Sequence, residues 1–66
     1  MAVLKVLEIL SNSKVSWEDA TQKAIEKASE TIKGIRSANV QNQSVVVKDG
    51  KVMEFRINLK ITFEVK

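Results

Sequence analysis

Oxygen-bearing side chains are the main groups here that could do chemistry, because the chain contains no cysteine and no histidine. Without those two residue types, the usual pairings of a nucleophile with a base, and nearly all zinc sites, are excluded. The adjacent carboxylates Glu18 and Asp19 could act as acid and base, but capping is the commoner role at a helix start. The only two glycines, Gly34 and Gly50, both suit turns, which excludes a phosphate-binding loop. We therefore predict a protein that is not an enzyme.

Amide and carboxylate groups between residues 39 and 49 raise the question of calcium, which needs only oxygen ligands. The candidates are Asn39, Gln41, Asn42, Gln43 and Asp49. Their spacing matches no EF-hand loop, so a polar strand is the default interpretation. Calcium stays an alternative, with its ligands unknown.

Charge and aromatic content argue against a nucleic-acid partner. The 11 basic and 8 acidic side chains give a formal charge of +3 but are spread along the chain. Bases would have one tryptophan and two phenylalanines to stack on. The single tryptophan, Trp17, could stack on a flat ligand, although at a first helical position it more often packs in a core or interface.

We expect neither a membrane segment nor a targeting segment at the start of the chain. The opening apolar run, residues 2–10, is interrupted by Lys5 and Glu8. It is too charged for a signal-peptide core and too short to span a bilayer. Because the absence of cysteine is compatible with a reducing compartment, we expect a cytoplasmic protein.

One helix is predicted over residues 16–33, where apolar side chains recur three and four residues apart. Ser16, followed three residues later by Asp19, makes a capping box at its start. Gly34 can adopt the left-handed conformation that ends a helix. The apolar stripe consists of Trp17, Ala20, Ala24, Ile25, Ala28 and Ile32.

Three strands complete a single domain over residues 1–66. Residues 53–65 alternate apolar and polar side chains with the period of a strand. Asp49 and Gly50 suit a type I′ turn, which makes residues 38–48 the preceding strand of a hairpin. The run 3–10 is short and rich in β-branched residues, which favours a strand. The predicted fold class is α+β, with β-α-β-β order and a three-stranded antiparallel sheet wrapped around one helix.

The last strand is too long for the helix to cover. About 14 residues of strand extend roughly 46 Å, whereas an 18-residue helix extends about 27 Å. Phe63 and Val65 would then form an exposed apolar tip, which invites contact with another chain. A small domain without disulfides commonly gains stability by oligomerisation, so we expect other copies of the chain to cover this tip.

The other face of the same strand is polar throughout. It carries Arg56, Asn58, Lys60 and Thr62. A solvated outer face is the default for an antiparallel sheet. The alternative is a lining for a polar cavity or for subunit junctions in an assembly.

An ordered set of short motifs resembles the dodecin family. The motifs are SWEDA at 16–20, A-x-x-K-A-S-x-T-I at 24–32, G-x-V-x-x-F-R at 50–56 and I-x-L-K-I-T-F at 57–63. The resemblance spans essentially the whole chain. It implies a β-α-β-β subunit that assembles as a hollow homododecamer and stores small ligands without catalysis. Flavin-binding dodecins hold riboflavin-type ligands in pairs near two-fold subunit contacts.

The resemblance also implies a binding site. In flavin-binding dodecins the flavin ring stacks on a tryptophan shortly after the helix, and a glutamine on the last strand bonds to the ring edge. Those positions fall on Ser37 and Arg56 in this chain, and Arg36, Ala38 and Gln43 complete the expected ligand-binding residues. Since an aromatic ring contributes about 1–3 kcal/mol of stacking, a serine there predicts a lost or weakened flavin site.

Two alternatives stay open for the function. Arg56 could donate to flavin carbonyls or stack on the ring, which would preserve genuine storage of FMN or riboflavin. The chain also looks closer to a calcium-associated branch of the family that lacks the tryptophan and carries an arginine on the last strand. That branch suggests a structural or calcium-binding cage, in which Arg56 could instead pair with Glu54 or Glu64 of a neighbouring copy.

Overall fold

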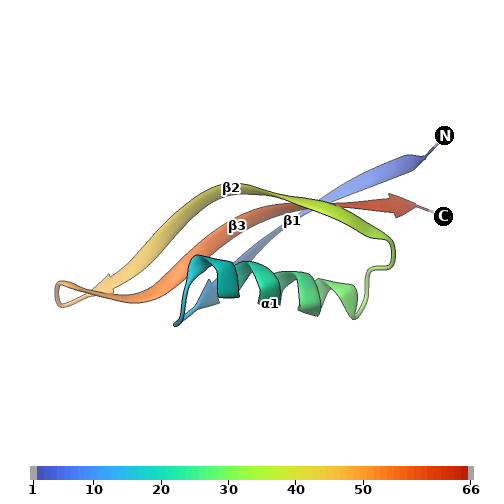
Figure 1. The fold of residues 1–66 in the computed structure, drawn as a ribbon. Helices are drawn as coiled ribbons and strands as arrows, with labels where there is room; N and C mark the ends of the chain where they lie inside the picture. The colour runs from blue at the N-terminus through green and yellow to red at the C-terminus, as the bar shows by residue number, and fades with distance from the viewer. Residues whose placement is uncertain (1, 66) are drawn as a thin grey trace.

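The computed structural model describes residues 2–65, which form three strands and one helix. In chain order these are β1 (Val3–Ser13), α1 (Trp17–Ser29), β2 (Ile35–Lys48) and β3 (Lys51–Val65). The strands make one antiparallel sheet in the order β1-β3-β2, and α1 lies across one of its faces (Figure 1). The predicted β-α-β-β fold is confirmed.

The core lies between α1 and the middle of β3. Ala20 and Ala24 of the helix are buried against Ile57 and Leu59 of the strand. Because an alanine side chain ends at Cβ, the helix backbone can approach the sheet closely. Ile61 is also fully buried, one strand repeat farther along β3.

Trp17 extends this core at the start of the helix. Its ring meets that of Phe55 edge to face, with centroids 5.3 Å apart and an interplanar angle of 77°. Its Nε1 donates a hydrogen bond of 3.0 Å to the backbone oxygen of Ser44. The side chain therefore ties α1 to both β2 and β3, and the expected packing role of Trp17 is confirmed.

The helix is shorter than predicted, since it ends at Ser29 and not at Lys33. The N–H groups of Thr31 and Ile32 both reach the oxygen of Ala28, at 3.2 and 2.8 Å, which tightens the last turn and then ends it. The C-cap, Glu30, has ordinary right-handed backbone angles.

Gly34 does not cap the helix, although its φ of +76° is in the predicted left-handed region. It turns the chain onto the sheet, where its backbone oxygen accepts a 2.9 Å hydrogen bond from the N–H of Glu64. A Cβ at this position would lie 3.2 Å from the oxygen of Glu64, so only glycine fits without strain. Strand β2 consequently begins at Ile35, three residues earlier than predicted.

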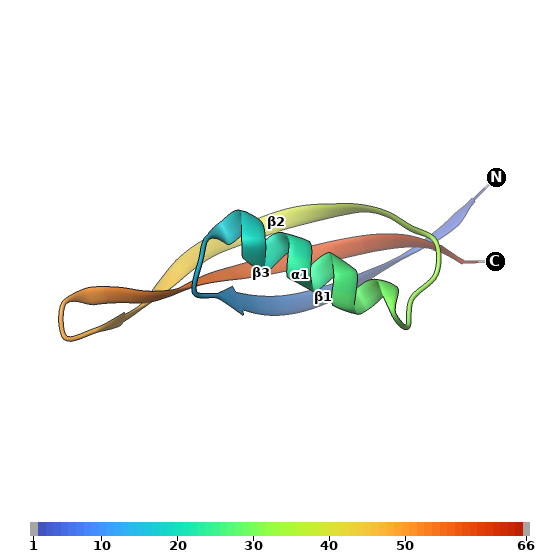
Figure 2. The same cartoon turned by 60° about the horizontal axis from the view of Figure 1, so that its bottom comes forward.

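The sheet extends beyond the helix at both ends, and the molecule measures 51 × 20 × 13 Å. A 13-residue α1 covers about 20 Å of the roughly 50 Å that a 15-residue β3 extends. At one end Val65 is 41% exposed, as expected, while Phe63 is half-buried. At the other end the β2–β3 hairpin projects past the start of α1, as Figure 2 shows. Its turn residues Asp49 and Gly50 have φ values of 54° and 76°, which confirms the type I′ prediction.

Candidate functional site

The face of the sheet opposite α1 is polar over β2 and β3. Residues paired across antiparallel strands point to the same face, and alternate residues of β3 point away from the buried Ile57, Leu59 and Ile61. Each row on this outer face joins one residue of β1, one of β3 and one of β2. The rows are Asn12–Arg56–Ser44, Leu10–Asn58–Asn42, Glu8–Lys60–Asn39 and Val6–Thr62–Ser37. The predicted polar face of β3 is therefore part of a broader polar surface.

Apolar side chains border this surface along β1. Leu4, Val6 and Leu10 are 53%, 60% and 70% exposed on the same face. Exposed aliphatic side chains in a row beside a polar surface are typical of a contact with another molecule. The outer face thus combines a polar centre with an apolar margin.

Arg56 is held on the outer face, near the end of β1, by an amide. Its Nε donates to Oδ1 of Asn12 at 3.2 Å, and Nδ2 of Asn12 donates to Oε1 of Glu54 at 3.1 Å. The amide therefore links the cation to the carboxylate, and Arg56 takes part in none of the ion pairs of residues 2–65. Within the described residues the terminal nitrogens of the guanidinium make no hydrogen bond, so they can bind a ligand or a neighbouring copy.

Arg36 is engaged within its own chain. Its guanidinium donates from Nε to Oε1 of Glu64 at 3.1 Å and forms an ion pair with the same oxygen. A β-bulge between Ile35 and Ser37 places Arg36 beside β3, where Ser37 and Ala38 pair with Thr62 and Ile61. The positive charge of Arg36 is thus already balanced by Glu64.

The predicted ligand-binding residues do not meet within one chain. Ser37 lies beside Thr62 and Arg56 lies six residues away along β3, which is roughly 20 Å. Gln43 pairs with Ile57 and so lies on the helix-bearing face, opposite to Arg56. A single ligand could touch both Ser37 and Arg56 only if different copies of the chain supplied them.

Sequence reasoning did not single out Asn12 or Ser13, and it placed Asn58 only in a polar stripe. The Oδ1 atom of Asn58 is buried and has no hydrogen-bond partner within the described part of the chain. An orphaned buried acceptor of this kind needs a donor or a cation, since leaving it unpaired is unfavourable. Asn58 therefore joins Arg56 as a candidate ligand-binding residue.

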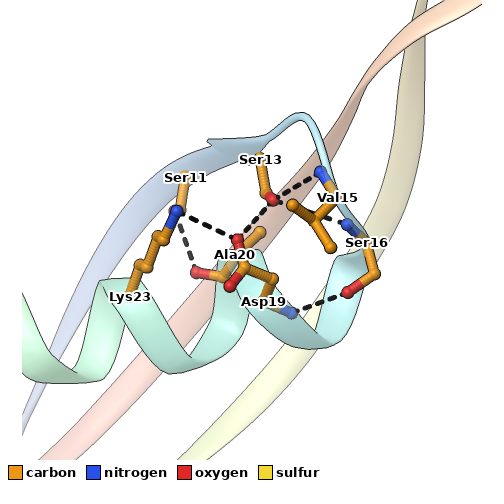
Figure 3. A network of polar contacts seen from close by, with 7 residues as sticks. All are labelled: Ser11, Ser13, Val15, Ser16, Asp19, Ala20 and Lys23. Carbon is orange, nitrogen blue, oxygen red and sulfur yellow. Dashed lines mark hydrogen bonds and ion pairs between the residues drawn. The ribbon is translucent and has the colours of Figure 1, made fainter.

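Ser13 fastens the end of β1 to the start of α1, as Figure 3 shows. Its hydroxyl donates to Oδ2 of Asp19 at 2.5 Å and accepts the N–H of Val15 at 2.9 Å. The N–H of Asp19 in turn donates to Oγ of Ser16 at 3.0 Å, which confirms the predicted Ser cap. The carboxylate does not reach back to Ser16, because it is bound by Ser13 and by Lys23 at 3.1 Å.

These contacts give Asp19 a structural role. The hydrogen bond from Ser13, followed by that from Lys23, holds the pKa of Asp19 below its ordinary value of 3.8. A carboxyl group with a lowered pKa stays ionised and is a poor proton donor. This agrees with the expected capping role for the carboxylates at the helix start.

A groove of about 700 Å³ lies between α1 and β1, on the helix-bearing side. Its floor is apolar and its rim carries Lys23, Lys27 and Glu30. Within residues 2–65 no three acidic side chains gather closely enough to hold a metal ion. The only helix of that stretch, α1, is neither long nor apolar enough to cross a membrane.

Comparison with known proteins identifies the family. The dodecin family model matches residues 3–66. Calcium dodecin from Mycobacterium tuberculosis is 33% identical over 66 residues, which span this whole chain and 93% of the relative. The crystal structure of a calcium-chelating calcium dodecin from that organism, which has a novel calcium-binding site, matches with a TM-score of 0.84 and 35% identity. That match covers 97% of this chain and 91% of the calcium dodecin.

A second solved structure is less similar in sequence but more similar in backbone geometry. The dodecin of Streptomyces coelicolor matches with a TM-score of 0.94 over 98% of this chain and 93% of its own, at 23% identity. At that identity the match shows a shared fold. With the family model and the calcium dodecin sequence, it leads to one conclusion: the chain belongs to the dodecin family.

Proposed function

We propose that this chain assembles as a homododecameric cage that binds and stores a small ligand without catalysing a reaction, and that flavin is a poor ligand for it. The observation that carries the proposal is the exposed Ser37 at the start of β2, where flavin-binding relatives are expected to place a stacking ring. A serine has no aromatic face, and the missing stacking energy is about 1–3 kcal/mol per ring.

Assembly is supported by the surface that one chain leaves uncovered. Large aliphatic side chains are exposed on both faces of β1, among them Val3, Leu7 and Leu10. The roughly 20 Å between Ser37 and Arg56 also means that a shared ligand requires neighbouring copies. The cage and its ligand site are therefore proposed together.

Flavin fluorescence tests the proposal. We expect the wild-type protein to leave the fluorescence of micromolar FMN and riboflavin unquenched, and Ser37→Trp to quench it. The stacking energy corresponds to a gain in affinity of roughly 5- to 150-fold. Ser37→Ala is the matched control, because it removes the hydroxyl and adds no ring. Strong quenching by the wild-type protein would refute the claim that flavin is a poor ligand.

Retained flavin storage through Arg56 gives a different result. The free guanidinium nitrogens would then bind the phosphate of FMN, so FMN would bind more tightly than riboflavin. Arg56→Met should abolish that preference while leaving riboflavin binding unchanged. Light scattering tests the assembly separately, since a particle with the 7.4 kDa mass of one chain would contradict the cage.

Calcium binding is the second candidate function. It is favoured by the similarity to calcium dodecin and by the orphaned Oδ1 of Asn58, an oxygen of the kind that calcium prefers. Asn42, across the strand from Asn58, could supply another amide oxygen, with the remaining ligands from a neighbouring copy. Calorimetry of chelator-treated protein should show heat with calcium that weakens in Asn58→Ala, with magnesium as the control ion. A flat titration would leave a purely structural cage.

A further inference from the structure

Glu54 and Arg56 lie on one face of β3 and carry opposite charges, yet they do not pair. Residues two apart on a strand point to the same face and lie about 6.6 Å from one another, which both side chains are long enough to close. No ion pair of residues 2–65 joins them. Another group therefore holds apart a carboxylate and a guanidinium that would otherwise attract one another.

The amide of Asn12 is that group. Asn12 lies directly opposite Arg56 on β1, accepts from its Nε at 3.2 Å and donates from Nδ2 to Oε1 of Glu54 at 3.1 Å. An amide carries an acceptor and a donor on one neutral plane, so one side can face a cation and the other an anion. The reverse orientation would set a donor against Arg56 and an acceptor against Glu54. The two charged neighbours thus fix the orientation of the amide.

Two replacements of similar shape would undo this arrangement in different ways. Leucine at position 12 has neither a donor nor an acceptor, so it would leave Glu54 and Arg56 free to pair directly. Aspartate has acceptors only, so it would pair with Arg56 itself and repel Glu54. In both cases a carboxylate of the same chain would neutralise the guanidinium. The amide of Asn12 holds Arg56 without neutralising it.

The remaining donors around Arg56 fit a phosphate group. Arg56 is exposed, and its two terminal nitrogens, which make no hydrogen bond within the described residues, match two oxygens of a phosphate or carboxylate. Ser44, the exposed residue opposite Arg56 on β2, adds a hydroxyl that can donate to a third oxygen. A phosphate offers three such oxygens and a carboxylate offers two, so phosphate is the better match.

We propose that Asn12 is a positioning residue that keeps Arg56 from pairing with Glu54, so that Arg56 and Ser44 bind the phosphate group of the stored ligand. The proposal rests on the small-ligand storage proposed above and names the class of ligand, a phosphate-bearing molecule. All four side chains belong to one chain, so this contact does not depend on the assembly.

Calorimetry with inorganic phosphate tests the class of ligand, at an ionic strength of about 0.01 M because salt screens exposed charges. We expect binding to the wild-type protein and none to Arg56→Met, which removes the charge. Lys60→Met is the matched control, since Lys60 is the next cation on this face, four residues along β3 and opposite Glu8. It should weaken binding much less, and acetate should bind more weakly than phosphate. Equal losses for Arg56→Met and Lys60→Met would overturn the assignment.

Variants of Asn12 test its role. Asn12→Leu should lower the affinity for phosphate by roughly 1.4- to 5-fold, the strength of an exposed ion pair between Glu54 and Arg56. Adding Glu54→Gln removes the competing carboxylate and should restore the wild-type affinity. Adding Glu54→Gln to Asn12→Asp should not, because the carboxylate at position 12 still pairs with Arg56. If Asn12 acted only through packing, Glu54→Gln would rescue neither variant, and that result would refute the positioning role.

Glu54→Gln alone gives a check that keeps Asn12 in place. The amide already separates Glu54 from Arg56, so the affinity for phosphate should stay close to that of the wild type. A gain of about fivefold would mean that Glu54 competes for Arg56 despite the amide, and would contradict the proposal.

Failure of this inference is distinguishable from failure of the cage. If light scattering shows a multimer that does not bind phosphate, the class of ligand is wrong while the assembly stands. If scattering shows a single-chain mass and Arg56 still binds phosphate, the cage is refuted and the role of Asn12 stands.

Discussion

Replacing Ser13 by alanine removes the one oxygen atom that joins the end of β1 to the start of α1. Ser13 is only 5% exposed, and its hydroxyl binds the carboxylate of Asp19 and the N–H of Val15. It also accepts a longer contact of 3.4 Å from the N–H of Ser16. Alanine leaves all three partners in place and satisfies none of them.

The size of the effect follows from which partners water can reach. Val15 is 70% exposed, so its N–H can be rehydrated, and Asp19 keeps its ion pair with Lys23. The N–H of the half-buried Ser16 is then the one group left without a partner, and an unpaired N–H costs at most about 1–3 kcal/mol. In a domain of this length each kcal/mol lost from the free energy of unfolding lowers the Tm by about 4–8 °C.

The assay is urea unfolding of wild-type and Ser13→Ala protein at one chain concentration, because the stability of an oligomer depends on concentration. Ser29→Ala is the matched control. The Ser29 hydroxyl donates to the oxygen of Ile25 at 2.7 Å on an exposed turn of α1, so its loss should cost less than about 0.5 kcal/mol. Equal losses for the two variants would refute the claim that Ser13 joins β1 to α1.

Two further predictions concern the same scaffold. The pKa of Asp19 is below its ordinary value of 3.8 in the folded chain. The ionised carboxylate therefore stabilises the fold above pH 3.8, and this stabilisation is lost as the pH falls through the lowered pKa. Urea midpoints of wild type and Asp19→Asn should thus differ most near neutrality and converge in acid; a constant difference would contradict this. Gly34→Ala should lower the Tm more than Gly50→Ala, because both have a φ of +76° but only Gly34 lies against Glu64. The left-handed conformation alone costs about 1–2 kcal/mol, and equal Tm losses would show that the contact with Glu64 is unimportant.

The order of elements was predictable because two independent patterns agree. The helical spacing around Ala20 and Ala24 and the alternation around Leu59 each select one buried face, and the structure packs those faces together. The end of the helix was not predictable from spacing, because Ile32 continues the helical stripe. Tertiary pairing decides it, since the oxygen of Gly34 must reach Glu64 on β3 and the chain leaves the helix early to do so.

The candidate site was predictable only as a set of positions. Strand β2 lacks clean alternation, and its pairing with β3 shifts register between Ile35 and Ser37, between Val40 and Asn42, and again between Val46 and Val47. These bulges decide which face each residue joins, and no pattern in the sequence locates them. Asn12 and Arg56, which are hydrogen-bonded, lie 44 residues apart along the chain, so local spacing does not predict their contact.

Strand β1 supports the proposal that the function belongs to an assembly and not to the single chain. Leu7 pairs with the buried Ile61, whereas Val6 pairs with Thr62 on the outer face, and the two side chains are 41% and 60% exposed. Apolar side chains on both faces are typical of a strand that is covered on both sides. Strand β1, however, is an edge strand, and only α1 lies against one of its faces within the described residues. Its sequence therefore fits surroundings that other copies supply. In the proposed cage Ser37 and Arg56 approach one another only between copies, so we expect the contacts that complete the core to be those that form the ligand site.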